Sequence, residues 1–123
     1  MKTSKRRLGD LGEEIAVQEL ERLGHVILRR NWRHAHLEID IVSRDRTGLH
    51  FVEVKSRTAP VSASPEENVT PSKQAKLATA ALCFLNEEKP GDAEVFFDII
   101  TVVFCGGQTE VNYYKQAFIP TYY

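Results

Sequence analysis

The stretch that decides the fold is residues 37–56, LEIDIVSRDRTGLHFVEVKS. Its first half alternates between apolar and acidic residues, which is typical of a half-buried strand over 36–44. The apolar positions are Leu37, Ile39 and Ile41, and the acidic positions are Glu38 and Asp40. Residues 45–48, DRTG, are a turn signal, and residues 49–56 have the composition of a second strand. The stretch therefore predicts a hairpin with carboxylates on one face.

The register of this hairpin follows from the turn. If residues 45–48 form a four-residue loop, position 44 pairs with position 49, which places Asp40 across from Glu53 and Glu38 across from Lys55. Opposed Cβ atoms in such a ladder lie about 4.5–5.5 Å apart. A slip of one residue would turn every side chain to the other face and mix the acidic positions with apolar ones. The pattern therefore favours the register that brings the charged side chains together.

Two carboxylates directly opposed on a sheet repel one another, so the arrangement needs a compensating charge. A divalent cation would supply it, since Mg²⁺ is held by one or two carboxylates together with waters and substrate phosphates. Lys55 lies two residues from Glu53 on the same face. Its ammonium group could hold or activate a metal-bound water, or stabilise charge on a phosphate under attack. Asp40 and Glu53 are thus candidate ligands for Mg²⁺ or Mn²⁺.

The rest of the chain alternates between helical and strand patterns. The predicted elements are a helix over 8–24, a strand over 25–30, the two hairpin strands, a helix over 71–88 capped by Thr70, and strands over 94–104 and 110–118. The residues expected to face the core from the two helices are Leu8, Leu11, Ile15, Ala16, Leu20 and Leu23 in the first and Leu77, Ala81, Leu82 and Leu85 in the second. This order predicts an α/β protein with a mixed central sheet of about five strands flanked by helices.

The composition places limits on the class of protein. A length of 123 residues suits one domain spanning 1–123, and 42% hydrophobic with 27% charged residues is typical of a globular chain. No run approaches the roughly 20 apolar residues of a membrane span, so no membrane partner is expected. Cys83 and Cys105 lie in apolar runs without metal-type spacing, which predicts buried free thiols in a cytoplasmic protein.

A net charge of −1 argues against binding nucleic acid by bulk charge alone, although residues 1–60 hold 12 Lys and Arg against 9 Asp and Glu. The candidate nucleic-acid-binding residues are Arg30, Arg33, Arg57, Lys73 and Lys76. The first two flank Trp32, so they either clamp phosphates beside a stacked base or form a basic edge strand with the indole packed on the core. The two lysines lie in the first turns of the second predicted helix, and the N-terminus of a helix is a favourable binding position for a phosphate.

Three further features of the sequence leave alternatives open. His34, His36, Glu38 and Asp40 share one parity, so a zinc site is an alternative to the magnesium site. Glu38 is equally suited to a cross-strand ion pair with Lys55 and to a metal role. Residues 57–70 predict a long loop of the kind that more often serves function than connection, and Asp98 predicts a structural hydrogen-bonding residue within an apolar strand.

Asp40 followed by Glu53-Val54-Lys55 resembles the Asp…(Asp/Glu)-x-Lys signature of the restriction-endonuclease-like superfamily, and the predicted element order resembles its core. More closely, the chain resembles the bacterial YraN-like family, which is similar to archaeal Holliday-junction resolvases. The matching segments are Gly9-x-x-Gly12-Glu13-x-x-Ala16, Ile27-Leu28-x-Arg30-Asn31-Trp32-Arg33, Glu38-Ile39-Asp40-Ile41, Phe51-Val52-Glu53-Val54-Lys55-x-Arg57 and Phe97-Asp98-Ile99-Ile100. Two residues depart from the patterns: Leu37 replaces a usual glycine, and Ile39 replaces the proline of the broader signature.

The resemblance implies a metal-dependent endonuclease that hydrolyses phosphodiester bonds in DNA, with branched and single-stranded DNA as the forms it suggests and RNA as a further substrate to test. The roles it implies are Asp40, Glu53 and the Val54 carbonyl as ligands of Mg²⁺ or Mn²⁺, Lys55 as the catalytic lysine, and Glu13 and Glu38 as supporting acids. Resolvase-like chemistry on two strands would suit a homodimer. The alternatives are a non-catalytic nucleic-acid-binding module that keeps the nuclease fold, and a protein-interaction domain.

Overall fold

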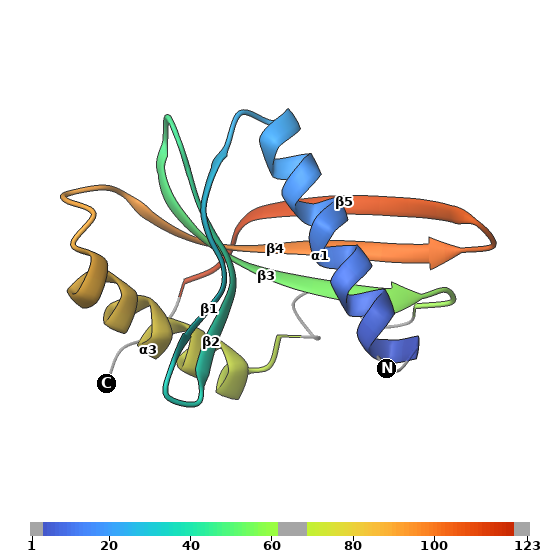
Figure 1. Ribbon diagram of the computed structural model, residues 1–123, viewed down its shortest axis with the longest axis horizontal. Coiled ribbons are helices and arrows are strands. Elements are labelled where there is room, and N and C mark those ends of the chain that lie inside the picture. The colour runs from blue at the N-terminus through green and yellow to red at the C-terminus, as the bar shows by residue number, and fades with distance from the viewer. Residues whose placement is uncertain (1–3, 62–68, 120–123) are drawn as a thin grey trace.

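The computed structural model describes residues 4–61 and 69–119. It contains two helices and five strands along the chain (Figure 1). In order these are α1 (Ser4–Arg22), β1 (Val26–His34), β2 (Leu37–Asp45), β3 (Gly48–Thr58), α3 (Pro71–Glu88), β4 (Val95–Cys105) and β5 (Gln108–Phe118). No described helix is both long enough and apolar enough to cross a membrane.

The five strands form one sheet in the order β1-β2-β3-β4-β5. The β3–β4 pair is parallel and the other three pairs are antiparallel. The parallel pair requires a crossover, which the chain makes through α3. The predicted α/β class, with a mixed five-stranded sheet flanked by helices, is therefore confirmed.

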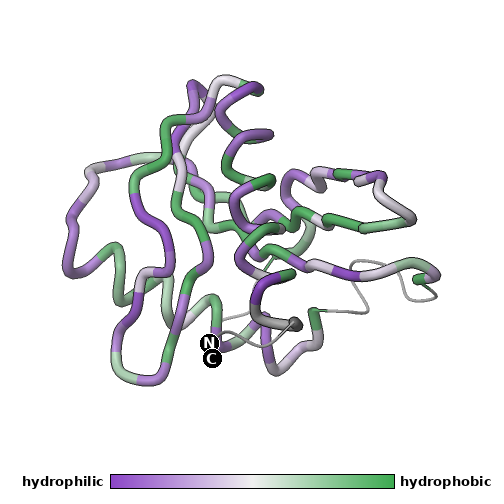
Figure 2. Tube along the Cα trace, turned by 45° about the vertical axis from the view of Figure 1, so that its right-hand side comes forward, coloured by the Kyte–Doolittle hydropathy of each residue, from purple (hydrophilic) through white to green (hydrophobic). Residues whose placement is uncertain are grey.

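Two hydrophobic cores lie on opposite faces of this sheet. Neighbouring residues of β3 point to different sides, so that Phe51 packs with α3 and Val52 packs with α1. Figure 2 shows the amphipathic character of α1, in which hydrophobic and hydrophilic positions follow one another within each turn. β4 lies between the two layers, and its residues from Phe97 to Val102 are buried, as its apolar sequence predicts.

The second helix begins where the sequence predicts. The Thr70 hydroxyl accepts a hydrogen bond from the backbone N–H of Lys73 at 3.3 Å, and Pro71 occupies the first helical position. The residues that the helix buries are Leu77, Ala78, Ala80, Ala81 and Phe84. The expectation for Leu82 is wrong, since that side chain is exposed and Phe84 lies in the core instead.

The β2–β3 hairpin has the predicted register, with Arg44 opposite Leu49. Its loop is shorter than predicted, because Asp45 and Gly48 themselves pair. The Asp45 carboxylate closes the turn by accepting the backbone N–H groups of Thr47 and Gly48, at 2.9 and 3.2 Å. A Cβ atom on Gly48 would lie 2.3 Å from the carbonyl oxygen of Glu94, so the residue must be glycine.

Several finer expectations are corrected. Leu11 and Leu23 of α1 are exposed rather than buried. Leu37 and Ile39 pack in the α3-side core whereas Ile41 packs in the α1-side core, so the three do not share one face. Cys105 is exposed because it ends β4 beside a glycine turn. The centre of the predicted 57–70 loop, residues 62–68, lies outside the described residues.

Gly12 sets the distance between α1 and the sheet, and its replacement by alanine should be destabilising. An added Cβ would lie 1.8 Å from Ser56 Oγ and 3.0 Å from Ser56 Cβ. We expect Gly12→Ala to lower the free energy of unfolding by about 1–3 kcal/mol in urea denaturation. The matched control is Gly9→Ala in the same helix, where no atom lies within 4 Å, and it should be neutral or stabilising by up to about 1 kcal/mol. Equal effects of the two variants would refute this account of the contact.

Candidate functional site

The candidate site lies where β2 and β3 separate. The two strands pair from Asp45–Gly48 to Ile41–Val52, and beyond that point β2 stays with β1 while β3 stays with β4. Figure 1 shows this fork, with the β1–β2 hairpin turning toward α3 and β3 continuing beneath α1. The predicted ladder pairs Asp40–Glu53 and Glu38–Lys55 are therefore not formed, although the predicted register holds in the paired part.

Asp40 lies at the base of the fork. Its Oδ2 atom accepts a hydrogen bond from the backbone N–H of Val54 at 2.9 Å. Beyond the last paired residues, Ile41 and Val52, this side-chain hydrogen bond takes the place of a backbone hydrogen bond between β2 and β3. Burial, followed by the negative charge of Glu53, raises the pKa of Asp40 to about 7. Glu38 and Glu13 act in the same direction, and the Val54 N–H opposes them. Asp40 is thus a carboxylate that the protein holds in a poorly solvated, negatively charged position.

Glu53 is the second carboxylate of the pair. Burial raises its pKa, while the positive charges of Lys55 and Lys73 lower it in part. The Lys55 ammonium nitrogen lies 3.5 Å from Glu53 Oε1, and both side chains are mostly buried, at 11% and 23% exposed. Contact with Lys55 lowers the pKa of Lys73, which extends from the first turn of α3. The fork therefore carries two neighbouring carboxylates flanked by two neighbouring lysines.

Glu13 reaches the fork from α1. The side-chain amide of Asn31 donates to Glu13 Oε1 at 2.8 Å, and Arg30 Nε lies 3.4 Å from the same oxygen. Asn31 has a φ of 50°, in the left-handed region that asparagine tolerates better than most residues, and this conformation directs its amide toward α1. Sequence reasoning missed Asn31 as a positioning residue, because its role depends on this local backbone twist.

Two open depressions meet at Asp40. One, of about 290 Å³, is lined by Leu8, Gly9, Glu13, Asp40, Val54, Lys55, Ser56 and Arg57. The other, of about 280 Å³, is lined by His36, Leu37, Glu38, Asp40, Glu53, Lys73, Lys76 and Leu77. Asp40 is common to both, so a ligand in either depression would contact it. The structure therefore brings together nine of the sequence-predicted residues: Asp40, Glu53, Val54, Lys55, Glu13, Glu38, Arg57, Lys73 and Lys76.

The two predicted arginines of β1 have different surroundings. Arg30 pairs with Glu13 and Glu14, so its guanidinium is engaged in holding α1 against β1. Arg33 is 69% exposed and lies 3.6 Å from Glu38, which shows Glu38 paired with Arg33 rather than with Lys55. The indole of Trp32 packs edge-on against Phe84 in the α3-side core. The interpretation of this strand as a basic edge strand with a packed tryptophan is the one that the contacts support.

The alternative zinc arrangement of His34, His36, Glu38 and Asp40, at the β1–β2 turn and the start of β2, does not form. His34 bonds to Glu87 of α3 at 2.6 Å, and its ring stacks on Trp32. Across the described parts of the chain, no group of three metal-ligating side chains includes His34, His36, Glu38 or Asp40. The donor set at the fork instead consists of carboxylate and carbonyl oxygens, which suit a hard divalent cation. The repulsion between Asp40 and Glu53, which Lys55 and Lys73 offset only in part, also fits such an ion, since its charge would act on both carboxylates.

The fold and fork together define an α/β protein with a paired-carboxylate site at a split in its sheet. The chain matches the model of the Uncharacterised protein family UPF0102 over residues 12–102 and belongs to that family. It is 39% identical over 122 residues to a UPF0102 protein of Geobacter metallireducens, covering 99% of this chain and 100% of the relative. It is also 42% identical over 113 residues to a UPF0102 protein of Bacteroides fragilis, covering 92% of this chain and 93% of the relative.

Proposed function

We propose that the protein is a metal-dependent endonuclease that hydrolyses phosphodiester bonds in DNA, with Mg²⁺ or Mn²⁺ bound at the fork. The observation that carries this proposal is the half-buried pair Asp40 and Glu53, flanked by the ammonium groups of Lys55 and Lys73. A site with negative charge at its base and positive charge at its rim suits a divalent cation and a phosphate bound side by side.

Each side chain of the fork has a distinct part in this proposal. Asp40 and Glu53, with the Val54 carbonyl, would hold the ion, which supplies Lewis-acid activation of the phosphate. Lys55, which forms an ion pair with Glu53, would donate a hydrogen bond to the attacking water or to the phosphate. Because the pKa of Asp40 is raised, metal binding must release its proton, so affinity for the ion should fall below about pH 7.

The basic residues along the depressions would bind the phosphate backbone. Lys73 and Lys76 extend from the first two turns of α3 and line the same depression as Glu53, and Arg57 lines the depression on the other side of Asp40. Because the two depressions share Asp40, a strand that passes over the fork with its scissile phosphate near Asp40 would have basic side chains on both sides. Such contacts fix position and do not depend on sequence.

The double variant Lys73→Ala/Lys76→Ala should weaken DNA binding and reduce its dependence on salt. Each phosphate contact contributes about 0.7–0.9 to the slope of log K against log salt, so we expect the magnitude of the slope to fall by about 1.4–1.8 for the two lysines. Fluorescence anisotropy of labelled DNA at several salt concentrations, in chelator, measures this slope. Arg22→Ala is the control, since Arg22 pairs with Glu19 at the other end of α1. An unchanged slope in the lysine variant would refute the proposed contact of Lys73 and Lys76 with the DNA backbone.

The experiment that tests the proposed activity is a panel of DNA and RNA substrates incubated with Mg²⁺, with Mn²⁺ and with chelator. The panel includes single strands, duplexes, flaps and four-way junctions. We expect cleavage of at least one DNA form that requires the divalent ion. Salt-dependent binding without metal-dependent cleavage of any substrate would replace the proposal with that of a non-catalytic nucleic-acid-binding module. If the protein neither binds nor cleaves any nucleic acid of the panel, both the nuclease and the nucleic-acid-binding module are excluded.

A further inference from the structure

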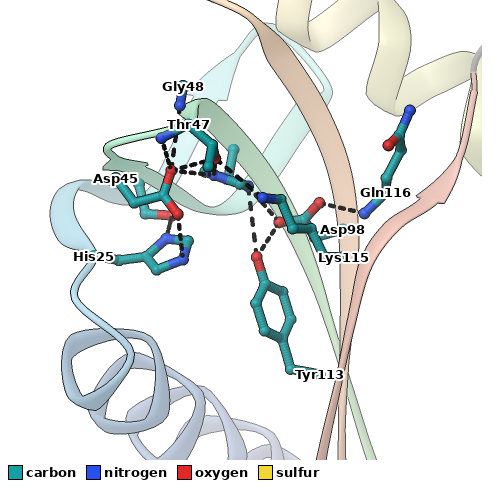
Figure 3. Close-up of polar contacts among 10 residues, drawn as sticks. His25, Asp45, Thr47, Gly48, Asp98, Tyr113, Lys115 and Gln116 are labelled. Atoms are coloured by element: carbon teal, nitrogen blue, oxygen red, sulfur yellow. Dashed lines mark hydrogen bonds and ion pairs between the residues drawn. The ribbon is translucent and has the colours of Figure 1, made fainter.

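A second polar cluster lies at the opposite end of the β2–β3 hairpin from the fork (Figure 3). It is formed by His25 just before β1, Asp45 at the end of β2 and His50 in β3. His50 Nε2 lies 2.9 Å from Asp45 Oδ1, and His25 Nε2 lies 3.5 Å from Asp45 Oδ2. Within residues 4–61 and 69–119, this is the one group of three His, Cys, Asp or Glu side chains whose ligand atoms all lie within 4.8 Å of one another.

Both histidine rings are oriented by partners on their other nitrogen. His25 Nδ1 lies 2.9 Å from Ser43 Oγ, and His50 Nδ1 lies 2.6 Å from Asp98 Oδ2. Asp98 is fully buried, and it also accepts hydrogen bonds from the Tyr113 hydroxyl and, at 2.9 Å, from the backbone N–H of Gln116. Metal-binding histidines in proteins are held in the same way, with the second ring nitrogen bonded to a carboxylate or another polar group. The partners thus leave both Nε2 atoms directed at Asp45.

We propose that His25, Asp45 and His50 form a Zn²⁺ site. Tetrahedral zinc with bonds of about 2.0–2.1 Å has neighbouring ligand atoms roughly 3.3 Å apart. The two Nε2 atoms lie 2.9 and 3.5 Å from Asp45, but from different oxygens of its carboxylate, so the ion would be held by both oxygens or by a slightly rotated Asp45 side chain. Two imidazole nitrogens favour zinc over the magnesium expected at the fork. The fourth position would be filled by water or by the hydroxyl of Thr47, whose oxygen lies 3.3 Å from His50 Nε2.

The charges around the cluster are consistent with a divalent ion. Asp45 and the buried Asp98 contribute two negative charges, which equal the charge of Zn²⁺ in size. Lys115 adds a positive charge at the edge of the cluster, where its Nζ lies 3.1 Å from Thr47 Oγ1. Each histidine would bind the ion as a neutral imidazole through its Nε2 atom.

The position of the cluster indicates what the ion would do. It would join the short segment between α1 and β1, through His25, to both strands of the β2–β3 hairpin near its turn. The ion would therefore fix the start of β1 relative to β2 and β3. The side chain of Asp45 is 16% exposed, whereas those of His25 and His50 are 3% and 0% exposed. The ion would thus enter from the Asp45 side. The role is structural and independent of cleavage at the fork.

The test is titration of the metal-stripped full chain with Zn²⁺ and with Co²⁺. We expect one equivalent of Zn²⁺ by calorimetry, and a rise in Tm of roughly 10 °C at a zinc concentration about 100 times Kd. Co²⁺ should give the strong visible absorption of a tetrahedral ion. His25→Gln and Asp45→Asn should each remove these signals, whereas His36→Gln, an exposed histidine outside the cluster, should keep them.

Asp40→Asn separates the two metal sites and should also leave the zinc signals unchanged. Absence of stoichiometric Zn²⁺ binding by the wild-type chain would overturn the proposal, as would binding that survives both cluster variants or that Asp40→Asn removes. If the cluster variants fail to fold, the wild-type protein still decides the question. In that case the histidine ring ¹⁵N resonances must report Zn²⁺ coordination by His25 and His50, and unchanged resonances overturn the proposal.

Discussion

Asp40→Asn is expected to abolish cleavage and, at the same time, to stabilise the metal-free protein at pH 8. Loss of a carboxylate ligand should reduce the cleavage rate by at least about 10³-fold, since a bound ion contributes several kcal/mol to charge stabilisation in the transition state. The asparagine oxygen can still accept the hydrogen bond from the Val54 N–H, so the fork should keep its geometry.

The stability gain follows from the raised pKa of Asp40. Burial and the charge of Glu53 raise it from 3.8 to about 7, so between these values the folded state binds more protons than the unfolded state. Stability is therefore lost as the pH rises through this window and stays lower above it. The pKa difference corresponds to at most about 4 kcal/mol, and we expect asparagine to recover roughly half, because the carboxylate keeps some access to water.

Urea denaturation in chelator at pH 4 and pH 8 measures this effect. The variant should exceed the wild type by about 2 kcal/mol at pH 8 and by little at pH 4, where Asp40 is protonated in the folded state. Saturating Mg²⁺ should reduce or reverse the difference at pH 8, because only the wild type binds the ion at full strength. If the variant were less stable than the wild type at pH 8, the proposed cost of burying the charged Asp40 beside Glu53 would be contradicted.

The second large effect is expected from Lys55→Ala. Removing this ammonium group should lower the single-turnover cleavage rate by about 10²–10⁴-fold, the range for loss of a positioned proton donor or charge stabiliser. Affinity for Mg²⁺ or Mn²⁺ should be unchanged or higher, because Glu53 loses a positive charge 3.5 Å from its carboxylate. The effect would thus appear in the rate and not in metal binding.

Lys76→Ala is the matched control for Lys55→Ala. Lys76 lines the same depression as Glu53, and it bears the same charge. We expect this variant to weaken DNA binding with little change in the rate at saturating DNA. If excess metal ion restored cleavage by Lys55→Ala, or if both lysine variants lost the same fraction of the rate, Lys55 would have no specific part in the chemistry.

The order of elements and the register of the central hairpin could be predicted from the sequence. Both depend on local signals, namely the alternation in residues 37–44, the Thr70-Pro71 helix start and the turn near Gly48. The fork could not be predicted, because it depends on which neighbour each strand pairs with beyond Ile41 and Val52. That choice is made by β1, which directly precedes the hairpin, and by β4, which follows it only after α3.

The candidate site was predictable in its residues more than in its contacts. Asp40, Glu53 and Lys55 lie within one short segment, so strand parity alone brings them together. Glu38 could not be assigned to Arg33 without the structure, since that pair depends on β1. The cluster of His25, Asp45, His50 and Asp98 gave no signal in the sequence, because its members come from four different segments and share no regular spacing.

The most direct test of the central claim is a single-turnover cleavage time course on the best DNA substrate of the panel, with wild type and Asp40→Asn at equal concentrations. The assay is run in Mg²⁺, in Mn²⁺ and in chelator, after circular dichroism has shown both chains folded. We predict metal-dependent cleavage by the wild type, none in chelator, and a rate at least about 10³-fold lower for the variant. Cleavage by Asp40→Asn at the wild-type rate, or wild-type cleavage that persists in chelator, would contradict the account.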